Sequence, residues 1–250
     1  MEKVQVVPAE KARTLLQRAR DAAAFPQEIP RGWSKSRVNP LELLTVFDSL
    51  RLKKGITLRA YQYRESSGGN AVVYAMPENT PFSEPAECEP DANRFLDPPV
   101  PPGALDDIME AVEGDGSPWS YFSASLLARE LMEFGAFWHG CSWSTHTIVD
   151  KEMPVKQTES LLRRKSGQDP DSPDVGIDVG QDEWEWLSPK PEDWDPIVRM
   201  SDELVTVTFY TISKLGVAAI YKHVDSYQTG SYSLESETAL IAQGPGGYKF

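Results

Sequence analysis

Residues 203–212 read ELVTVTFYTI, the strongest strand pattern in the chain. β-Branched and aromatic residues fill this stretch, as is typical of strands. The turn sequence SKLG at 213–216 leads into a second run at 217–227, and a last strand is expected around 238–242. Three strands without a clear helix are too few to bury a core, so they must combine with strands from earlier in the chain.

Two earlier segments are predicted to supply those strands. Residues 56–64 alternate polar and aromatic side chains, the turn sequence SSGGN follows at 66–70, and residues 71–76 are apolar, which together predict a β-hairpin. Residues 141–149 are rich in Thr, Trp, Ile and Val and also favour an extended conformation. We expect both segments to join the C-terminal strands in one antiparallel sheet of five or more strands.

Three segments carry helix signals. Residues 8–25 place Ala and Leu at helical spacing along one stripe. Ser117 and Pro118 form a cap with proline in the first turn, opening a helix that should end near Gly135, and Asn39 with Pro40 give the same signal for a short helix through residue 50. The fold class predicted is α+β, with the helices packed on one face of the sheet.

Two unusual segments bear on domain organisation. Residues 77–104 contain eight prolines and six acidic residues, so we expect a long loop that sustains neither a helix nor an interior strand. Residues 166–196 contain ten acidic residues and one lysine, and within them 168–180 are expected to be mobile. We expect a single domain over residues 1–250 with this acidic excursion, anchored by Trp184, Trp186 and Trp194. A boundary near residue 165 is the alternative.

Composition excludes several classes of protein. A net charge of −13 repels phosphate backbones, so we expect no nucleic-acid partner. Two cysteines are too few for a disulfide framework or a four-thiolate metal site, and the first residues lack the apolar core of a signal peptide. The longest apolar run is far shorter than the roughly 20 residues of a membrane helix. We expect a cytoplasmic protein with no transmembrane segment.

Candidate catalytic residues fall in two places. Residues 138–146 read WHGCSWSTH, and Cys141 with His139 close in sequence could supply a nucleophile and a base. His223 and Asp225 share one face of the strand predicted at 217–227, where the carboxylate could orient the imidazole or share a metal with it. If 141–149 lies beside that strand, His146 and His223 should meet in a His-His-Asp pocket.

A basic and aromatic cluster is the candidate ligand-binding surface. Arg59, Tyr61 and Tyr63 point to one face of the first hairpin strand, and Arg64 and Tyr74 lie close to them in the predicted hairpin. We expect this face to be half exposed, where it could contact an anionic ligand.

These observations favour a non-catalytic binding, scaffold or accessory protein that acts on a protein or small-molecule partner. The alternative is an enzyme, a hydrolase or a metal-assisted catalyst, that uses the cluster at 139–146 with His223 and Asp225; the sequence identifies no cofactor for it. A second alternative is an acidic inhibitor or antitoxin-like protein whose tract at 169–195 occupies a basic site on its target.

Overall fold

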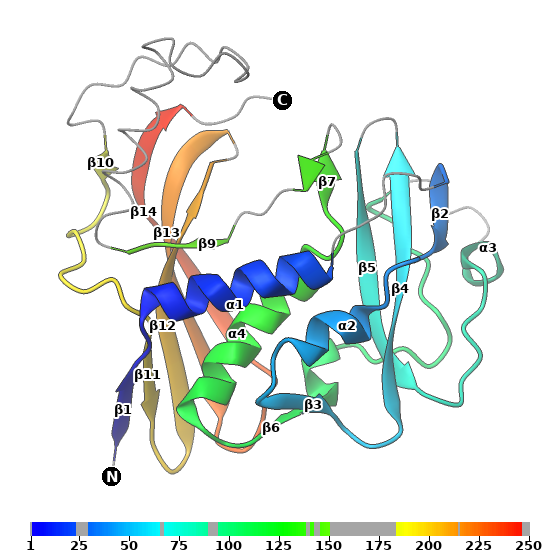
Figure 1. The fold of residues 1–250 in the computed structure, drawn as a ribbon, viewed down its shortest axis with the longest axis horizontal. Coiled ribbons are helices and arrows are strands. Elements are labelled where there is room, and N and C mark those ends of the chain that lie inside the picture. Colours follow the sequence, from blue (N-terminus) through cyan, green and yellow to red (C-terminus); the bar gives the residue numbers. More distant parts are fainter. Residues whose placement is uncertain are drawn as a thin grey trace.

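The computed structural model describes residues 2–23, 30–65, 68–89, 95–138, 141–142, 146–150, 184–214 and 216–246. Within these ranges the chain forms two main antiparallel sheets, one two-stranded ribbon and four α-helices (Figure 1).

The larger sheet has seven strands and is built mainly from the C-terminal third of the chain. Its order is β1-β11-β12-β13-β14-β10, and β9 pairs with β12. The strands are β1 (Lys3–Val6), β9 (Thr147–Ile148), β10 (Glu185–Trp186), β11 (Ile197–Met200), β12 (Leu204–Ser213), β13 (Val217–Gln228) and β14 (Glu235–Gly246). The strands predicted at 203–212 and 217–227 are therefore confirmed as the neighbours β12 and β13. Strand β14 is longer than predicted.

The smaller sheet has the order β2-β4-β5-β7-β8. Its strands are β2 (Gly32–Lys35), β4 (Ile56–Glu65), β5 (Gly68–Pro77), β7 (Phe137–Trp138) and β8 (Cys141–Ser142). The hairpin is confirmed, with pairing from Ile56 opposite Pro77 to Glu65 opposite Gly68. A separate ribbon pairs β3 (Leu50–Leu52) with β6 (Val112–Gly114).

The prediction of one sheet that joins all these strands is wrong. Strands β4 and β5 belong to the smaller sheet, and the segment 141–149 is divided between β8 in the smaller sheet and β9 in the larger one. The physical reason is burial: most residues of β4 are buried regardless of which face they point to, so the hairpin has its own cover and does not depend on the C-terminal strands.

The helices are α1 (Ala9–Ala22), α2 (Pro40–Thr45), α3 (Pro85–Cys88) and α4 (Pro118–Met132), with a 3₁₀ helix η1 (Ile108–Ala111). Both predicted caps are present, since the side chain of Asn39 accepts from Leu41 N and that of Ser117 from Ser120 N. Helix α2 ends before residue 50, where β3 begins. The exclusion of any helix from 77–104 is wrong, because Pro85 occupies the first turn of α3, where proline is tolerated.

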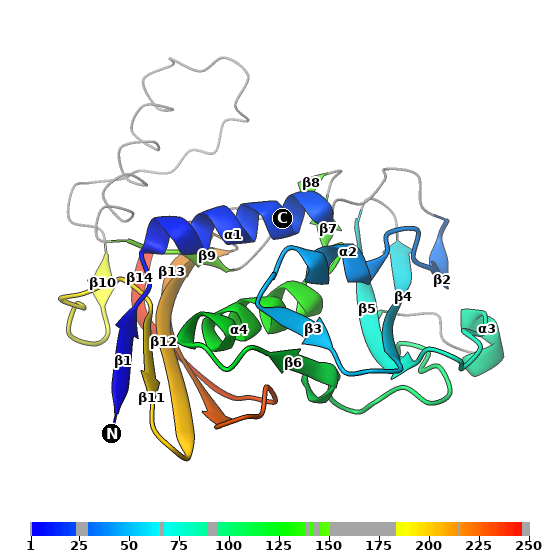
Figure 2. The same ribbon diagram turned by 60° about the horizontal axis from the view of Figure 1, so that its bottom comes forward.

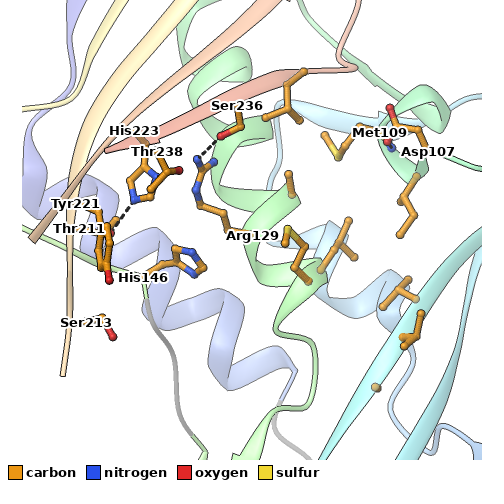
Figure 3. Close-up of a pocket in the computed structure, with 18 of the residues that line it drawn as sticks. Asp107, Met109, Arg129, His146, Thr211, Ser213, Tyr221, His223, Ser236 and Thr238 are labelled. Carbon is orange, nitrogen blue, oxygen red and sulfur yellow. Dashed lines mark hydrogen bonds between the residues drawn. The ribbon is translucent and has the colours of Figure 1, made fainter. Parts of the chain in front are cut away.

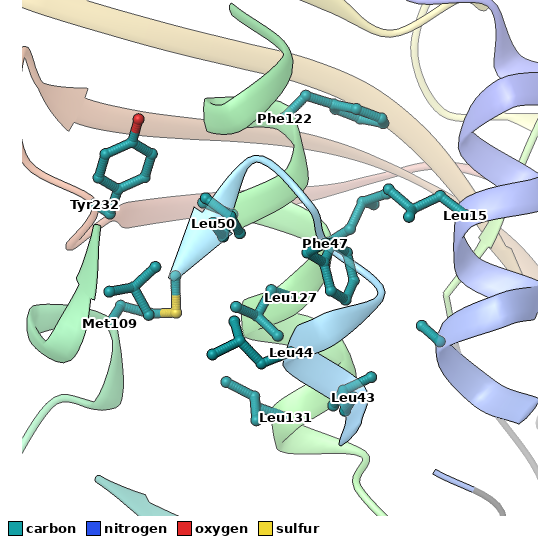
Figure 4. Packing of buried hydrophobic residues seen from close by; sticks show 14 of the residues in the cluster. Leu15, Leu43, Leu44, Phe47, Leu50, Met109, Phe122, Leu127, Leu131 and Tyr232 are labelled. Carbon is teal, nitrogen blue, oxygen red and sulfur yellow. The ribbon is translucent and has the colours of Figure 1, made fainter. Parts of the chain in front are cut away.

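Helix α4 is the central element of the fold. It contacts β11 and β12 of the larger sheet, β5 of the smaller sheet, and α1 (Figures 1 and 2). Its apolar residues Phe122, Leu127 and Leu131 pack with side chains from α1, α2 and β3 in one buried cluster (Figure 4). That cluster includes Leu58 of β4 and Val207 of β12, so one core serves both sheets. The division at residue 165 lies outside the described residues, and the single domain stays a prediction.

A second, smaller cluster anchors the end of the acidic excursion. Trp194 is buried against Ile212 and Ile220, and Trp184 and Trp186 pack on the same cluster. The anchoring predicted for these three tryptophans is confirmed. Most of 166–196, including the segment 168–180 predicted to be mobile, lies outside the described residues. None of the helices in the described ranges has the length and apolarity needed to span a membrane.

Candidate functional site

A groove of about 870 Å³ lies between the two sheets, and α4 passes between its two sides (Figure 3). We call it the inter-sheet groove. One side is mostly apolar and comes from β5 and η1, including Val72, Ile108 and Met109, with Asp106 and Asp107 directly before η1. The other side is polar and comes from β12, β13, β14 and the residue before β9; its members include Thr211, Ser213, Tyr221, His223, Ser236, Thr238 and His146. Ala128, Leu131 and Met132 line it from α4.

A buried ion pair joins α4 to the polar side. Arg129 donates two hydrogen bonds to Asp225, of 2.7 and 2.9 Å, and its guanidinium lies 4.6 Å from the ring centroid of Phe209. Ser236 Oγ donates to Asp225 Oδ1 over 2.7 Å and accepts from Arg129 over 3.1 Å. Both carboxylate oxygens are therefore engaged. The prediction that Asp225 orients His223 is wrong, because a guanidinium on α4 occupies the carboxylate instead.

His223 is held between two threonines. Thr211 Oγ1 lies 2.8 Å from Nε2 and Thr238 Oγ1 lies 3.0 Å from Nδ1, so one ring nitrogen donates and the other accepts. The residue is only 3% exposed. Burial, followed by the positive charge of Arg129 and by His146, lowers the pKa of His223 to about 3. The imidazole is therefore neutral at physiological pH, with both nitrogens in hydrogen bonds.

His146 lies beside His223, with the two ring centroids 6.0 Å apart. The predicted proximity of the two histidines is confirmed, but not by the expected route: β9 pairs with β12 and not with β13. Asp225 does not line the groove, so the expected His-His-Asp pocket does not form. His146 Nδ1 lies 3.1 Å from Glu133 Oε2. The backbone carbonyl of His146 accepts a hydrogen bond from Arg20 over 2.8 Å. Arg20 also reaches Glu130 Oε1 at 3.3 Å. Burial raises the pKa of Glu130, more than Arg20 lowers it.

The remaining catalytic candidates, His139 and Cys141, stay predictions. His139 and the side chain of Cys141 lie outside the described residues. The backbone of Cys141 belongs to β8 of the smaller sheet, whereas His146 precedes β9 of the larger one. In the described part of the chain, no group of three or more His, Cys, Asp or Glu side chains is placed to hold a metal ion.

The tyrosine cluster is buried, so the expected half-exposed face is wrong. Tyr61, Tyr63 and Tyr74 are each no more than 7% exposed. The Pro-rich segment covers them: Tyr61 stacks on Phe82 at a centroid distance of 4.5 Å and donates to the carbonyl of Ser83 over 2.8 Å.

The remaining members of the expected ligand-binding surface are Tyr74, Arg59 and Arg64. Tyr74 donates to the carbonyl of Pro99 over 2.9 Å, and burial raises its pKa to about 12. Arg59 is exposed, whereas Arg64 lies 5.9 Å from the ring of Phe137 on another part of the sheet. The basic and aromatic side chains therefore do not share one open surface. A ligand role for the arginines stays a prediction.

Sequence reasoning missed Arg129, Glu133 and the groove itself. Arg129 lies off the apolar stripe of its helix, where an arginine is ordinarily solvated, and no local signal distinguishes it. Tyr221 could be found, because it alternates with His223 on one strand face.

No family model, no curated protein and no solved structure matches this chain.

Proposed function

We propose that the protein is a non-catalytic binding protein whose partner occupies the inter-sheet groove. The observation that carries the proposal is the groove's two-sided lining, apolar on β5 and η1 and hydroxyl-rich on β12, β13 and β14. Its volume of about 870 Å³ is within the range of ligand sites, which combine a mostly apolar lining with a few placed polar groups.

The chemistry of the polar side favours a neutral polar group on the ligand. Arg129 is neutralised by Asp225, and His223 is uncharged because of its low pKa. The groups that remain on this side include the hydroxyls of Tyr221 and Thr238, which donate to and accept from amides and hydroxyls. A ligand with an apolar body and an amide or hydroxyl group matches both sides.

The engagement of the reactive groups supports binding over catalysis. A general base or metal ligand needs a nitrogen or oxygen directed at the substrate or metal. His223 uses both ring nitrogens on threonine hydroxyls, and Asp225 uses both oxygens on Arg129 and Ser236. Recruiting either residue for chemistry would break hydrogen bonds in a buried environment, which costs free energy.

The experiment is a fluorescence titration with N-phenyl-1-naphthylamine, a neutral apolar probe. We expect saturable binding to the protein and at least a ten-fold weaker affinity in Ala128→Phe, whose ring fills the groove from α4. Ala86→Phe on α3 is the matched control, because Ala86 is an exposed helical alanine outside the groove. If Ala128→Phe lowers the melting temperature, Met132→Trp at an exposed lining position replaces it. Equal affinities in all variants would refute the proposal.

An enzyme remains the second candidate, on one observation. Glu133 holds the ring of His146 at 3.1 Å in the groove, as a carboxylate does for a general base. This reading predicts hydrolysis of p-nitrophenyl acetate by the protein and its loss in His146→Gln with the fold intact. Roles for His139 and Cys141 remain predictions of this candidate.

The acidic inhibitor is the third candidate, and its tract at 169–195 lies mostly outside the described residues. Salt-sensitive binding of a basic target that survives Ala128→Phe would favour it, because the groove would then be dispensable.

Three further expectations belong to the proposal: one domain over residues 1–250, helices packed on one face of the larger sheet, and a cytoplasmic location. The core cluster shared by both sheets supports the first, and the low cysteine content supports the last.

A further inference from the structure

Among the described residues, strand β14 has no partner along much of its outer edge. It pairs with β13 along its length, and on its other side β10 pairs with it only at Ala242 and Gln243. In the described part of the chain, residues 235–240 have no strand on that side, and 235–239 are exposed. An open edge presents backbone N–H and C=O groups that can pair with another extended chain.

The inter-sheet groove lies at this edge. Ser236 and Thr238 line it, and they are alternate residues on one face of β14. A strand added beside β14 would run about 4.8 Å away, and every second side chain would point to the same face as Ser236 and Thr238, into the groove. The apolar side formed by Val72 and Met109 would receive those side chains. Backbone pairing on an edge and side-chain pockets beside it are the two components of strand addition.

The charges around the edge select the kind of strand. Glu235 and Glu237 are exposed on β14, on the face opposite Ser236 and Thr238, and β14 contains no lysine or arginine. Asp106 is exposed where it lines the groove, and no cation among the described residues pairs with it. Arg129, the arginine that lines the groove, is neutralised by Asp225. The surface is therefore complementary to lysine or arginine.

A second copy of the chain is a poor occupant of the edge. Pairing β14 with β14 would place glutamates of the two strands close together, and like charges across paired strands are destabilising. Each chain also carries a net charge of −13, which opposes self-association. The same glutamates that attract a basic strand therefore protect the edge from other copies.

We infer that the partner in the groove is an extended peptide segment that adds to the edge of β14, with apolar residues directed into the groove and alternate basic residues facing Glu235 and Glu237. This inference rests on the groove being the binding site proposed above. It deepens that proposal by naming backbone amides as the neutral polar groups and a basic strand as the partner.

The test uses two end-blocked heptapeptide libraries, with the patterns Lys-X-Lys-X-Lys-X-Lys and Glu-X-Glu-X-Glu-X-Glu, where X is Val, Ile, Leu, Thr or Phe. At low ionic strength we expect the lysine library to bind at least ten-fold more tightly than the glutamate library. Glu237→Lys together with Glu235→Lys should reverse the preference, and both positions are exposed, so the fold should not change. An unchanged preference in that variant would overturn the inference.

Backbone methylation separates strand addition from simple charge attraction. The tightest peptide is resynthesised with N-methyl groups on either of its two alternate sets of amides, because only one set faces β14 in a ladder. We expect one set to abolish binding and the other to change it only a few-fold. Equal effects of the two sets would contradict strand addition.

The naphthylamine probe separates a failure of the peptide inference from a failure of the groove as a binding site. If the probe binds in the groove but no peptide binds, the peptide inference fails and the groove remains a ligand site. If the probe binds equally to Ala128→Phe and to the unaltered protein, the groove itself fails as a site.

Discussion

Two strand faces carry alternating rings and polar groups at the same spacing, yet their surroundings differ. On β4, Tyr61 and Tyr63 lie beneath the Pro-rich segment, with their hydroxyls bonded to it or to a neighbouring glutamate. On β13, Tyr221 and His223 line a groove. Sequence alternation predicts that such side chains share a face, but a face becomes a site only if no other segment covers it. The segment that covers β4 is distant in sequence: Ser83, which accepts from Tyr61, is 22 residues away.

The largest effect should come from the covered face. Replacing Tyr61 by Ser should lower the free energy of unfolding by about 3–5 kcal/mol, because a fully buried ring is removed and leaves a cavity. Arg59→Ser, an exposed residue on the same strand, should change it by less than about 0.5 kcal/mol. Urea denaturation measures both. A loss under about 1 kcal/mol for Tyr61→Ser would mean that the ring is not covered in solution.

The ion pair behind the groove should have the next largest effect. Asp225→Asn leaves the buried guanidinium of Arg129 without its counter-charge and should cost about 3 kcal/mol or more. Replacing both residues, as Arg129→Met with Asp225→Leu, should recover most of that loss, because no uncompensated charge is then buried. A double variant as unstable as the single one would show that the pair does more than neutralise charge. Chemical denaturation of the unaltered protein, Asp225→Asn and the double variant measures the three free energies of unfolding.

The buried state of His223 should appear as a pH dependence. Its pKa is about 3 in the folded protein and near 6.5 in an unfolded chain, so below pH 6.5 the unfolded chain takes up a proton that the folded protein does not. Stability should therefore fall as the pH drops from about 6.5 towards 3, by up to about 1.4 kcal/mol per unit. The difference in the free energy of unfolding between the unaltered protein and His223→Gln, followed with pH, isolates this contribution, because the other titrating groups contribute equally to both. Parallel stability curves for the two proteins would place His223 in contact with water.

The smallest effect on stability should come from the open region. Met132 is 75% exposed on the edge of the groove, so Met132→Ser should leave the free energy of unfolding within about 0.5 kcal/mol. The variant should still bind the neutral probe several-fold more weakly, because less apolar area is buried when the probe binds. Leu187→Ser, which is 51% exposed and lies outside the groove, is the control. A probe affinity that falls equally in both variants would indicate non-specific contact.

The sequence predicted the elements better than their assembly. Local signals located α1, α4, the β4–β5 hairpin and the pair β12–β13, because periodicity, caps and turns act within a few residues. The division of 141–149 between two sheets depends on long-range packing, which no local pattern contains. The proximity of His146 and His223 was predicted from two strand patterns, but the adjacency of those strands was not observed, because β9 pairs with β12. The ion pair of Arg129 with Asp225 spans 96 residues and needed the fold.

Methionine methyl NMR tests the central claim most directly, because Met109 and Met132 line the groove while Met76 is buried in β5 and Met200 lies in β11. The protein is labelled with ¹³C at the methionine methyl groups and titrated with N-phenyl-1-naphthylamine. If the groove is the binding site, the Met109 and Met132 signals shift along one saturable curve while those of Met76 and Met200 stay in place. Shifts confined to Met76 or Met200, or saturable binding without any shift of Met109 and Met132, would contradict the account.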